Sequence, residues 1–577
     1  MPSHFDVAIL GGGPAGSTAA SMLRKYNPAL SVVVLDKETF PREHVGESQL
    51  PPIGGILEEM GVWDRVEACN FPVKVGATYR WGRTKDLWDF DFIPMKKLPD
   101  MPRPGTYDET RRRLACQVDR YQDDKVLLDR ARELGADVRE ATSVAKIHVD
   151  GDKVAGFELA GGQTITARHY IDGSGSAALM RRALGVEVDV PTKLKNIAVW
   201  NYWNNPEWEQ TLGKYATRVL VLSLGYGWIW FIPLSKTRVS IGLVCPAERY
   251  RASGLEFGAL YEKALKDEPL VAELTRNATH EGKLAATKDW SFVASRVVGE
   301  NWFLAGEAAG FADPILAAGL TLTHLSAREA AYTILELERG RHNPKWLKRW
   351  YQHNQRTRVT QHIRFADFWY SANGVFTDLQ EHTREIAKEA GLDLAPADAF
   401  RWLGTGGFTE DILGQVGIGG FDLNSARHVA QEFLGADAQW EISKFNLFWV
   451  NRKKASEEKV PAYQNGEVQA VPCLVRGQRK LPLVGLFAST VAAVEKHREI
   501  SKILAALSAY FRQRHSAGET DTIVKQCIQI MEVMLVEGWL TGKHDASLPL
   551  FEVKTPHEND YIHFNHELEE MVMSAVS

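Results

Sequence analysis

Residues 5–17 read FDVAILGGGPAGS, and this stretch predicts the core of a nucleotide-binding domain. Its first six residues are almost all apolar, which is typical of a buried parallel strand. Gly11, Gly13 and Gly16 follow in the G-x-G-x-x-G spacing, and STAASMLRKY continues in a helical pattern. These glycines allow a tight turn, close approach of the backbone to a diphosphate, and close packing of the helix on the strand. The N–H groups and partial positive charge of the helix N-terminus suit the same diphosphate.

Two further segments support this interpretation. A second apolar strand, SVVVLD, ends at Asp36, which lies 20 residues after Gly16. A carboxylate at that spacing binds a ribose hydroxyl in dinucleotide-binding folds. Residues 169–185, HYIDGSGSAALMRRALG, give another strand–turn–helix connection at Asp172. We expect it to belong to the same sheet.

Composition limits the possible classes of protein. A chain of 577 residues is too long for one core, so we expect two or three structural units. Its 45% hydrophobic and 24% charged residues are typical of a soluble globular protein. The net charge of −5 argues against nucleic acid as the main partner.

The cysteines and the termini suggest where the protein acts. The five cysteines are scattered without a C-x-x-C pair, so we expect no disulfide framework, no metal site and a reducing compartment. The first strand begins almost at once, which leaves no room for a signal peptide. No run of 18 apolar residues indicates a membrane span. We therefore expect a cytoplasmic protein.

The next segment, FPREHVGESQL at 40–50, follows the second strand. Gly46, Glu47 and Ser48 lie where a helix is expected to begin near the cofactor. Arg42 is a candidate partner for a phosphate. An ordinary capped loop is the alternative for Arg42.

Lys74 lies within FPVKVGATYRWG at 71–82, which alternates like a strand. Its neighbours Val73 and Val75 suggest that it is shielded from water. Desolvation lowers the pKa of a lysine and makes it useful as a donor or nucleophile. From composition alone, a surface lysine on an edge strand is the favoured alternative.

Residues 190–290 carry strand patterns rich in aromatic residues, which predicts a separate, largely antiparallel sheet. Within it, residues 227–233 read GWIWFIP. Trp228, Trp230 and Ile232 share one face of this strand. Such an apolar wall excludes water from a reactive centre. A tryptophan-rich core strand is the alternative.

Residues 301–324 read NWFLAGEAAGFADPILAAGLTLTH. A strand meets Gly306-Glu307, a turn follows at Asp313-Pro314, and Ala317-Ala318-Gly319 opens a long helix. Backbone N–H groups at such a helix start suit a small anion or the edge of a cofactor ring. Without other support, this is only a tight strand–helix connection.

Beyond about residue 345 the pattern becomes helical. We predict helices at 346–371, 378–391, 485–511 and 521–540, and Asn465-Gly466 predicts a hairpin turn. A lid, a dimer surface or a carrier-protein dock are all open as roles for this region.

Taken together, the motifs G-x-G-x-x-G, VGES, FPVK, DGSG, GWIWFIP and GEAAGFADP resemble those of the flavin-dependent halogenases, within the flavoprotein monooxygenases. The resemblance covers roughly residues 5–340, and W-x-W-x-I-P is its most specific element. It implies an α/β fold with a Rossmann-like FAD-binding module at 1–345 (parts about 1–72, 110–188 and 288–345). A substrate sheet (about 73–109 and 189–287) is interleaved with this module, and 346–577 form a mainly helical C-terminal region.

The resemblance also implies roles for individual residues. Lys74 falls where the family has its catalytic lysine, which replaces the surface-lysine alternative. Ala318 and Gly319 fall at the halide position, and Trp228, Trp230, Ile232 and Pro233 form an active-site wall. Residues expected to contact FAD are Gly11, Gly13, Pro14, Ala15, Gly16, Asp36, Lys37, Arg42, Ser48, Arg120, Asp172, Gly306, Glu307, Gly319 and Leu320.

The mechanism implied by the resemblance is that of a halogenase of secondary metabolism. A separate flavin reductase delivers FADH2, and O2 converts it to a C4a-hydroperoxide that oxidises chloride or bromide to hypohalous acid. This acid reaches Lys74, which passes the halogen to an electron-rich aromatic, either a small molecule or a carrier-protein-bound ring. The wall at 228–233 keeps the substrate away from the flavin.

Three departures from the family pattern leave alternatives open. Ala317 and Ala318 replace the serine or threonine that usually precedes Gly319, and Glu307 replaces an aspartate. Leu316 stands where tryptophan halogenases have a catalytic glutamate, which favours a phenol- or pyrrole-type substrate. The double alanine motivates a second hypothesis, an FAD-dependent monooxygenase that oxidises an aromatic without halide. A non-catalytic flavin-binding protein is the third.

Overall fold

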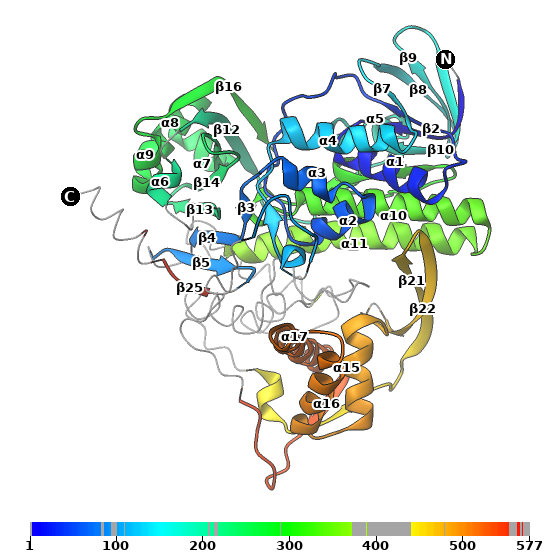
Figure 1. Ribbon diagram of the computed structural model, residues 1–577, viewed down its shortest axis with the longest axis vertical. Coiled ribbons are helices and arrows are strands. Elements are labelled where there is room, and N and C mark those ends of the chain that lie inside the picture. Colours follow the sequence, from blue (N-terminus) through cyan, green and yellow to red (C-terminus); the bar gives the residue numbers. More distant parts are fainter. Residues whose placement is uncertain are drawn as a thin grey trace.

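The computed structural model describes residues 3–81, 86–93, 101–108, 110–205, 208–212, 217–288, 290–371, 388, 440–477, 479–552, 562–565 and 568. They build an α/β fold in which a parallel sheet with its helices, a large antiparallel sheet and a C-terminal part are joined (Figure 1). The fold class predicted from the sequence is confirmed.

The nucleotide-binding sheet forms around the glycine-rich stretch. Its parallel strands lie in the order β7-β2-β1-β10-β18, and the hairpin of β8 and β9 continues from the other end of β10. Strand β1 pairs directly with β10, so the turns after Leu10 and Asp172 lie side by side, as predicted. The bounds are β1 His4–Leu10, β2 Val32–Leu35, β7 Asp137–Arg139, β8 Val144–Asp150, β9 Lys153–Leu159, β10 Thr164–Asp172 and β18 Trp302–Leu304.

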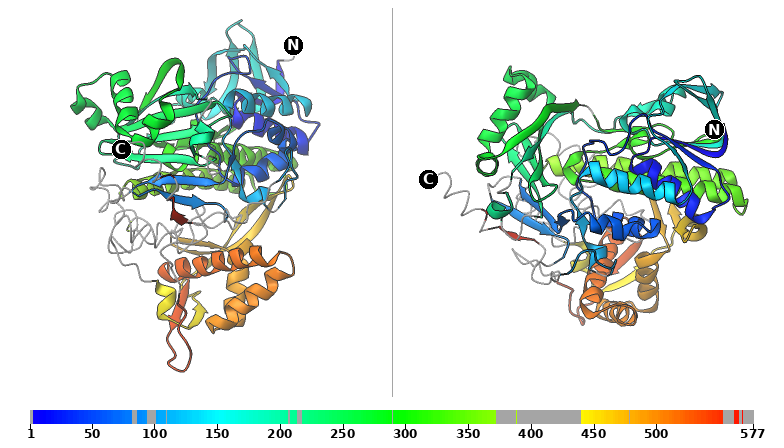
Figure 2. Two further views of the ribbon diagram at one scale, coloured as in Figure 1. Left: turned by 60° about the vertical axis from the view of Figure 1, so that its left-hand side comes forward. Right: turned by 45° about the horizontal axis from the view of Figure 1, so that its top comes forward.

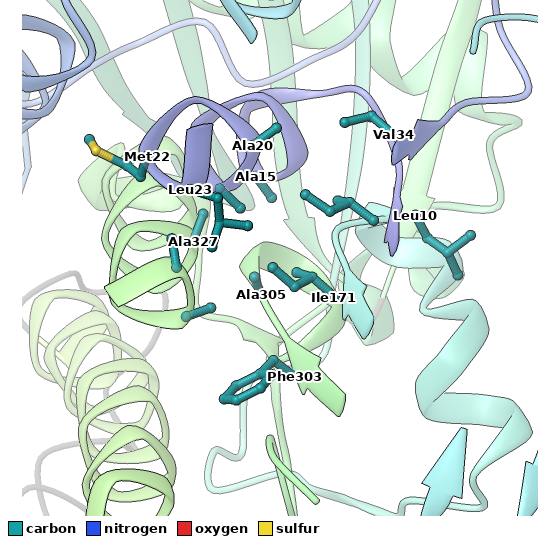
Figure 3. Packing of buried hydrophobic residues seen from close by; sticks show 14 of the residues in the cluster. Leu10, Ala15, Ala20, Met22, Leu23, Val34, Ile171, Phe303, Ala305 and Ala327 are labelled. Carbon is teal, nitrogen blue, oxygen red and sulfur yellow. The ribbon is translucent and has the colours of Figure 1, made fainter. Parts of the chain in front are cut away.

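Helices α1 (Pro14–Tyr26), α4 (Arg120–Glu133) and α10 (Gly319–Arg339) complete this layer. Figure 3 shows the apolar packing between α1, α10 and the strands, with Leu23 and Ala327 among the side chains between the two helices. Helix α11 (Pro344–Ser371) runs beside α10 in both Figure 1 and Figure 2. Among the shorter helices, α2 (Pro52–Met60) contacts α1 and α10, α3 (Trp63–Ala68) contacts α2 and α4, and α5 (Leu179–Ala183) contacts β8 and β10.

The second sheet has the order β16-β12-β15-β14-β13-β4-β5-β25, and all its pairs are antiparallel except β13 with β4. Helices α8 (Phe257–Asp267) and α9 (Pro269–Thr275) pack in the apolar cluster on one face, and α7 (Ala247–Ser253) contacts β12 and β15. These helices, and α6 (Trp208–Leu212), were not predicted. The strand bounds are β4 Gly76–Arg80, β5 Trp88–Asp91, β12 Asn196–Asn204, β13 Val219–Leu224, β14 Gly227–Pro233, β15 Arg238–Pro246, β16 Thr279–Lys288 and β25 Ile562–Phe564.

Two small sheets join these layers. Strand β3 (Val73–Lys74) pairs with β6 (Ala115–Cys116), and β17 (Phe292–Ala294) pairs with β11 (Val188–Asp189) and β19 (Gly310–Phe311). The strand predicted at 71–82 is therefore divided between β3 and β4. A helix was expected to begin at Gly46–Ser48, but α2 begins at Pro52, and Ser48 instead forms a β-bridge with Gln117.

The C-terminal part contains α15 (Gly485–Lys496), α16 (Ile500–Arg512) and α17 (Ala517–Val536), with β20 (Leu447–Val450) paired to β24 (Leu540–Lys543). A hairpin of β21 (Ser456–Gln464) and β22 (Glu467–Arg476), extended by β23 (Arg479–Pro482), turns at Asn465-Gly466 as predicted. The turn docks on α10, where Gly466 N donates to Tyr332 Oη at 2.9 Å. Figure 2 shows this hairpin reaching from the C-terminal helices to α10.

One helix prediction was wrong and one is untested. Residues 485–511 were predicted as a single helix, but the chain is extended between α15 and α16. There, Phe448 N donates to Arg498 O at 2.8 Å and Ile500 N donates to Asn446 O at 3.0 Å. Hydrogen bonds to β20 and to the residue before it therefore replace the hydrogen bonds of a continuous helix. The helix predicted at 378–391 lies outside the described residues, apart from Lys388.

Three further findings concern the described part of the chain. All five cysteines are free. No helix there has the length and apolar character needed to cross a membrane. Within the same residues, no group of three or more His, Cys, Asp or Glu side chains is arranged to hold a metal ion.

Gly16 provides a test of the turn after β1. A Cβ on Gly16 would lie 1.8 Å from the carbonyl oxygen of Gly11, which is backbone and cannot move aside like a side chain. We expect Gly16→Ala to cost about 1–3 kcal/mol or more and to lower the midpoint of thermal unfolding. Gly161→Ala is the matched control, because a Cβ there meets nothing within 4 Å. Equal midpoints for the two variants would contradict this account of the turn.

Candidate functional site

The first part of the site is the turn between β1 and α1. Gly11 has a φ of 92°, and a Cβ there would lie 2.4 Å from the carbonyl oxygen of Gly173. The two turns therefore touch through their backbones. Helix α1 begins at Pro14 with Gly13 at its N-cap, so its first N–H groups point out of the turn. This is the geometry that binds a diphosphate.

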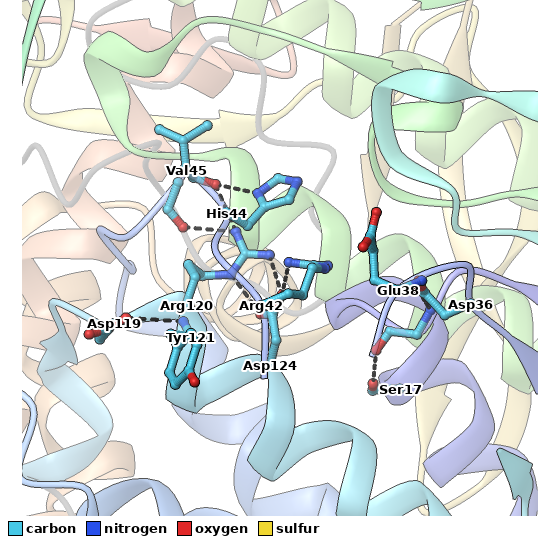
Figure 4. Close-up of polar contacts among 12 residues, drawn as sticks. Ser17, Asp36, Glu38, Arg42, His44, Val45, Asp119, Arg120, Tyr121 and Asp124 are labelled. Atoms are coloured by element: carbon cyan, nitrogen blue, oxygen red, sulfur yellow. Dashed lines mark hydrogen bonds and ion pairs between the residues drawn. The ribbon is translucent and has the colours of Figure 1, made fainter. Parts of the chain in front are cut away.

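Asp36 and Arg42 lie on either side of this turn. The Asp36 carboxylate accepts hydrogen bonds from Gly12 N at 2.6 Å and Glu38 N at 2.8 Å, which fixes it at the end of β2. A Cβ on Gly13 would lie 3.1 Å from Arg42 Nη2, so the guanidinium lies against the backbone of the turn. Arg42 also pairs with Asp124 at 3.0 Å (Figure 4). The structure thus brings both predicted residues to the turn.

Arg120, the first residue of α4, holds the loop that follows Arg42. Its Nε and Nη2 donate to the two oxygens of Asp124 at 2.6 and 2.9 Å, and its Nη1 donates to the carbonyls of Val45 at 2.9 Å and Gly46 at 3.1 Å. Figure 4 shows this guanidinium between Asp124 and Val45. Arg120 was predicted to contact the cofactor, and in the structure its donors hold the loop in place.

Asp172 also has a structural role. Its carboxylate accepts from Ser174 N at 3.0 Å, Ser174 Oγ at 2.6 Å, Met180 N at 2.8 Å and Arg181 N at 3.2 Å. It therefore caps α5 and fixes the turn beside Gly11. Lys37 does not join the others, because its side chain is 74% exposed and pairs with Glu38.

The turn before α10 brings the last predicted contacts to the same region. A Cβ on Gly306, which has a φ of 60°, would lie 3.4 Å from Ala15 Cβ, so this turn packs on the start of α1. Burial raises the pKa of Glu307, and the charge of Arg120 opposes this shift. Leu320, in the first turn of α10, is buried.

Several buried polar atoms along these elements have no hydrogen-bond partner among the described residues. They are Ser48 Oγ, Gln49 Nε2, both amide atoms of Gln117, and Thr321 Oγ1. A buried polar group without a partner is costly, so such atoms mark a place for a polar ligand. Together with the glycine turn they fit FAD. Ser48 was predicted, but Gln49, Gln117 and Thr321 were missed, because the sequence does not show their burial.

Lys74 is the most unusual cation of the site. Its side chain is only 2% exposed, and Nζ donates to the carbonyl of Gln49 at 3.0 Å. Nζ also lies 5.6 Å from the centre of the Phe92 ring. Burial lowers its pKa to about 7, so a large fraction of this amine is neutral at neutral pH. The structure therefore contains a desolvated lysine, and not the surface lysine that composition alone favours.

We call Trp228, Trp230, Ile232 and Pro233 the tryptophan wall, and all four residues are buried on β14. Trp228, Trp230 and Ile232 share one apolar cluster, whereas Ile229 and Phe231 belong to the cluster on the other face of β14. The predicted shared face is therefore confirmed. Leu50, Phe92 and Ala318 pack in or against the wall's cluster, so it connects the Lys74 region with the start of α10.

A buried hydrogen-bonded network fixes the wall to the turn before α10. Trp228 Nε1 donates to Tyr370 Oη at 2.8 Å, and Tyr370 Oη donates to Asp313 Oδ1 at 3.1 Å. Trp290 Nε1 donates to Asp313 Oδ2 at 3.2 Å. Burial raises the pKa of Asp313 to about 7. Tyr370 and Trp290 were not singled out from the sequence, which carries no motif for them.

The same aspartate shapes the segment that carries the double alanine. Asp313 Oδ1 caps the short helix at Pro314–Leu316 by accepting from Ile315 N at 2.9 Å. Ala317 then has a φ of 53°, and Gly319 begins α10 so close to Phe311 that a Cβ would lie 2.9 Å from its ring. The N–H groups of Ala318 and Gly319 belong to the unpaired start of this helix. They are suited to a small anion.

Glu47 is a further ionisable residue of this loop, and no sequence motif assigns it a role of its own. Tyr202 Oη donates to Glu47 Oε1 at 2.8 Å, and Gly46 N donates to Oε2 at 3.1 Å. Burial raises the pKa of Glu47 to about 7. This pair ties β12 of the second sheet to the loop that Arg120 holds.

Comparison with known proteins identifies a matching family and several similar proteins, three of which are described below. The FAD binding domain family matches residues 4–366. A tryptophan 2-halogenase of Chondromyces crocatus is 31% identical over 59% of this chain, which spans 63% of that relative's length. A 1H-pyrrole-2-carbonyl-[peptidyl-carrier protein] chlorinase of Pseudomonas fluorescens is 29% identical over 67% of this chain and 88% of its own. The flavin-dependent halogenase armH3 of Armillaria mellea is 30% identical over 59% of this chain and 69% of its own.

A similar solved structure covers nearly the whole chain. The flavin-dependent halogenase CmlS has a TM-score of 0.69 and 24% sequence identity, over 96% of this chain and 98% of its own. At this identity the likeness shows the fold. Because 96% of the chain is covered, this likeness of fold extends into the C-terminal part.

The buried lysine gives a prediction about stability and pH. Because the folded-state pKa of Lys74 is about 7 and its ordinary value is 10.5, the unfolded chain binds more protons between these limits. The free energy of unfolding therefore decreases as pH falls from 10.5 to 7, because protonation favours the unfolded chain. This decrease is complete below pH 7. We expect Lys74→Met to raise the midpoint of thermal unfolding at pH 7, by an amount that shrinks toward pH 10.

Lys153→Met on β9 is the control for this measurement, because that lysine is exposed. We expect its midpoint to follow that of the unmodified protein at every pH. A lower midpoint for Lys74→Met than for the unmodified protein at pH 7 would contradict a desolvated lysine.

Proposed function

Because the chain belongs to the FAD binding domain family and, within it, to the flavin-dependent halogenases, we propose that it halogenates an electron-rich aromatic ring through Lys74. The observation that carries this proposal is a lysine that is fully buried, bonded to one carbonyl and close to Phe92, a ring that packs against the cluster of the tryptophan wall. Burying an amine costs free energy of folding, and a buried group with a strongly lowered pKa is a candidate for a chemical role.

The residues that would hold FAD are those of the three turns. The glycine turn and Arg42 would bind the diphosphate, Asp36 the ribose, and the unpaired atoms of Ser48, Gln117 and Thr321 other polar groups of the cofactor. Bound in its reduced form, FAD supplies the reducing equivalents with which O2 is activated to oxidise a halide. We propose that a separate flavin reductase delivers the reduced cofactor.

Lys74 acts on the oxidised halide. Its neutral amine either donates a hydrogen bond to hypohalous acid or reacts with it, forming an N–halogen bond and releasing water. The aromatic carbon then takes the halogen, the ring loses its proton, and the amine is restored. The carbonyl of Gln49 accepts one N–H of Lys74, which leaves the lone pair of the neutral amine free to point elsewhere.

The tryptophan wall separates the substrate from the flavin. Its side chains are rigid and buried, and the hydrogen bond from Trp228 to Tyr370 fixes its orientation. The wall excludes water as well as a substrate that would otherwise be oxidised directly. Leu316 stands where tryptophan-type enzymes have a catalytic carboxylate. Its apolar side chain favours a phenol- or pyrrole-type substrate, because such a ring is already activated and needs no carboxylate. The similarity to a carrier-protein-dependent pyrrole chlorinase supports a carrier-bound ring as one form of the substrate.

Removal of the amine tests the proposed role of Lys74. We expect Lys74→Ala to lose halogenated product by at least about 100-fold, as removal of a catalytic acid–base or nucleophilic group does. The same variant should bind FAD and oxidise its reduced form at an unchanged rate. The assay supplies reduced FAD, O2 and chloride or bromide, with resorcinol or pyrrole-2-carboxylate as the acceptor, and product is measured by mass spectrometry. Lys153→Ala is the control. Undiminished product formation by Lys74→Ala would remove the lysine from the mechanism.

The double alanine gives a second test. We propose that Ala318 N and Gly319 N bind the halide without the hydroxyl that usually assists. A hydrogen bond from a hydroxyl to an anion is worth about 1.5–3 kcal/mol, so we expect Ala317→Ser to lower the halide concentration for half-maximal rate by about tenfold or more. The control is Ala160→Ser, because Ala160 is exposed and lies outside this loop. If halide affects neither the rate nor the product in either protein, the chain is instead a monooxygenase that oxidises its aromatic substrate without halide.

A further inference from the structure

A pocket lies beside the small sheet of β11 and β17, next to α5 and the start of β12. It has a volume of about 180 Å³ and is lined by residues of α5, β11, β12 and β17, together with the segment before β12. None of the residues assigned above to FAD, Lys74, the wall or the halide lines it. Junctions between domains are the places where small-molecule pockets most often occur.

Two side chains of this pocket, Asn196 and Arg181, have buried polar atoms without a partner among the described residues. Asn196 is only 3% exposed, yet neither Oδ1 nor Nδ2 of its amide has a partner among the described residues. Arg181 Nε is buried and equally without a partner, and its guanidinium makes one long hydrogen bond, at 3.4 Å, to the carbonyl of Val186. Lys195 adds a second cation at the rim. Two cations and a free amide favour an anionic group with oxygen acceptors.

The remaining walls are apolar and partly aromatic. Phe292 lies under the guanidinium of Arg181, with 5.2 Å from Cζ to the ring centre, and Trp290, two residues earlier, also lines the pocket. Val190 and Leu194 complete this side. The volume corresponds to about six water molecules at about 30 Å³ each, which is the size of a single-ring molecule. No Asp or Glu side chain lines the pocket.

We propose that this pocket binds a single-ring aromatic carboxylate, with its carboxylate toward Arg181, Lys195 and Asn196 and its ring against Trp290 and Phe292. Burial lowers the pKa of Arg181, and an anion held next to it would offset that cost. Trp290 also donates to Asp313, so the ligand would contact a member of the hydrogen-bonded network that shapes the halide loop. The proposal does not rest on the proposed halogenation.

The test is titration of the full-length protein, loaded with FAD, with benzoate by isothermal titration calorimetry. We expect saturable binding that Arg181→Gln and Lys195→Gln each weaken at least about tenfold, the usual effect of losing a hydrogen bond to a charged group. Arg182→Gln is the matched control, because Arg182 is the exposed neighbour of Arg181 and does not line the pocket. Benzamide, which has the ring without the charge, should bind at least about tenfold more weakly than benzoate.

Two additional readouts separate this proposal from its alternatives. Benzoate should change the tryptophan fluorescence of the unmodified protein, and Trp290→Phe should lose that change. Lys74→Ala should bind benzoate normally, whatever its effect on halogenation, because Lys74 does not line the pocket. Because Lys195 is exposed, Lys195→Gln should fold normally, and its affinity for benzoate tests the proposal if Arg181→Gln fails to fold. Undiminished binding in Lys195→Gln, equal binding of benzamide, or loss of binding in Lys74→Ala would each overturn the proposal.

Discussion

The ion pair between Arg120 and Asp124 is the interaction on which the site depends. Both side chains are buried, and breaking such a pair by removing one partner costs about 3–5 kcal/mol. Through two further donor bonds Arg120 holds the carbonyls of Val45 and Gly46, and through Asp124 it also positions Arg42. The loop fixed in this way carries Ser48 toward Gln117. It also presents the carbonyl of Gln49 to Lys74.

A second set of contacts brings together segments that are far apart in the sequence. Trp228 from β14, Tyr370 from α11 and Asp313 from the turn before α10 form one buried chain of hydrogen bonds. Asp313 in turn caps the short helix that leads to Ala317 and Ala318. The positions of the tryptophan wall and of the proposed halide loop are therefore set by the same carboxylate. A change at one of them would be felt at the other, because buried polar networks act as units.

Much of this arrangement could be predicted from local patterns in the sequence. The glycine turn, the two-residue periodicity of GWIWFIP and the Asn465-Gly466 turn each specify their own geometry through backbone constraints that act within a few residues. The missed features depend on tertiary contacts. The break at His497–Glu499 exists because β20 offers backbone partners, and Gln117 and Thr321 are candidate cofactor contacts only because other elements bury them. The sequence also could not show that Arg120 pairs with Asp124, one helical turn later, because the pairing depends on both side chains being buried together.

The unpaired buried atoms of Ser48, Gln117 and Thr321 have a consequence for the protein in the cell. A chain that folds around such atoms gains stability from whatever ligand satisfies them, in proportion to the logarithm of ligand concentration over its dissociation constant. The fraction of unfolded molecules, and with it the rate of degradation, then falls as FAD becomes available. Flavin supply would therefore set how long each molecule survives as well as how many are active.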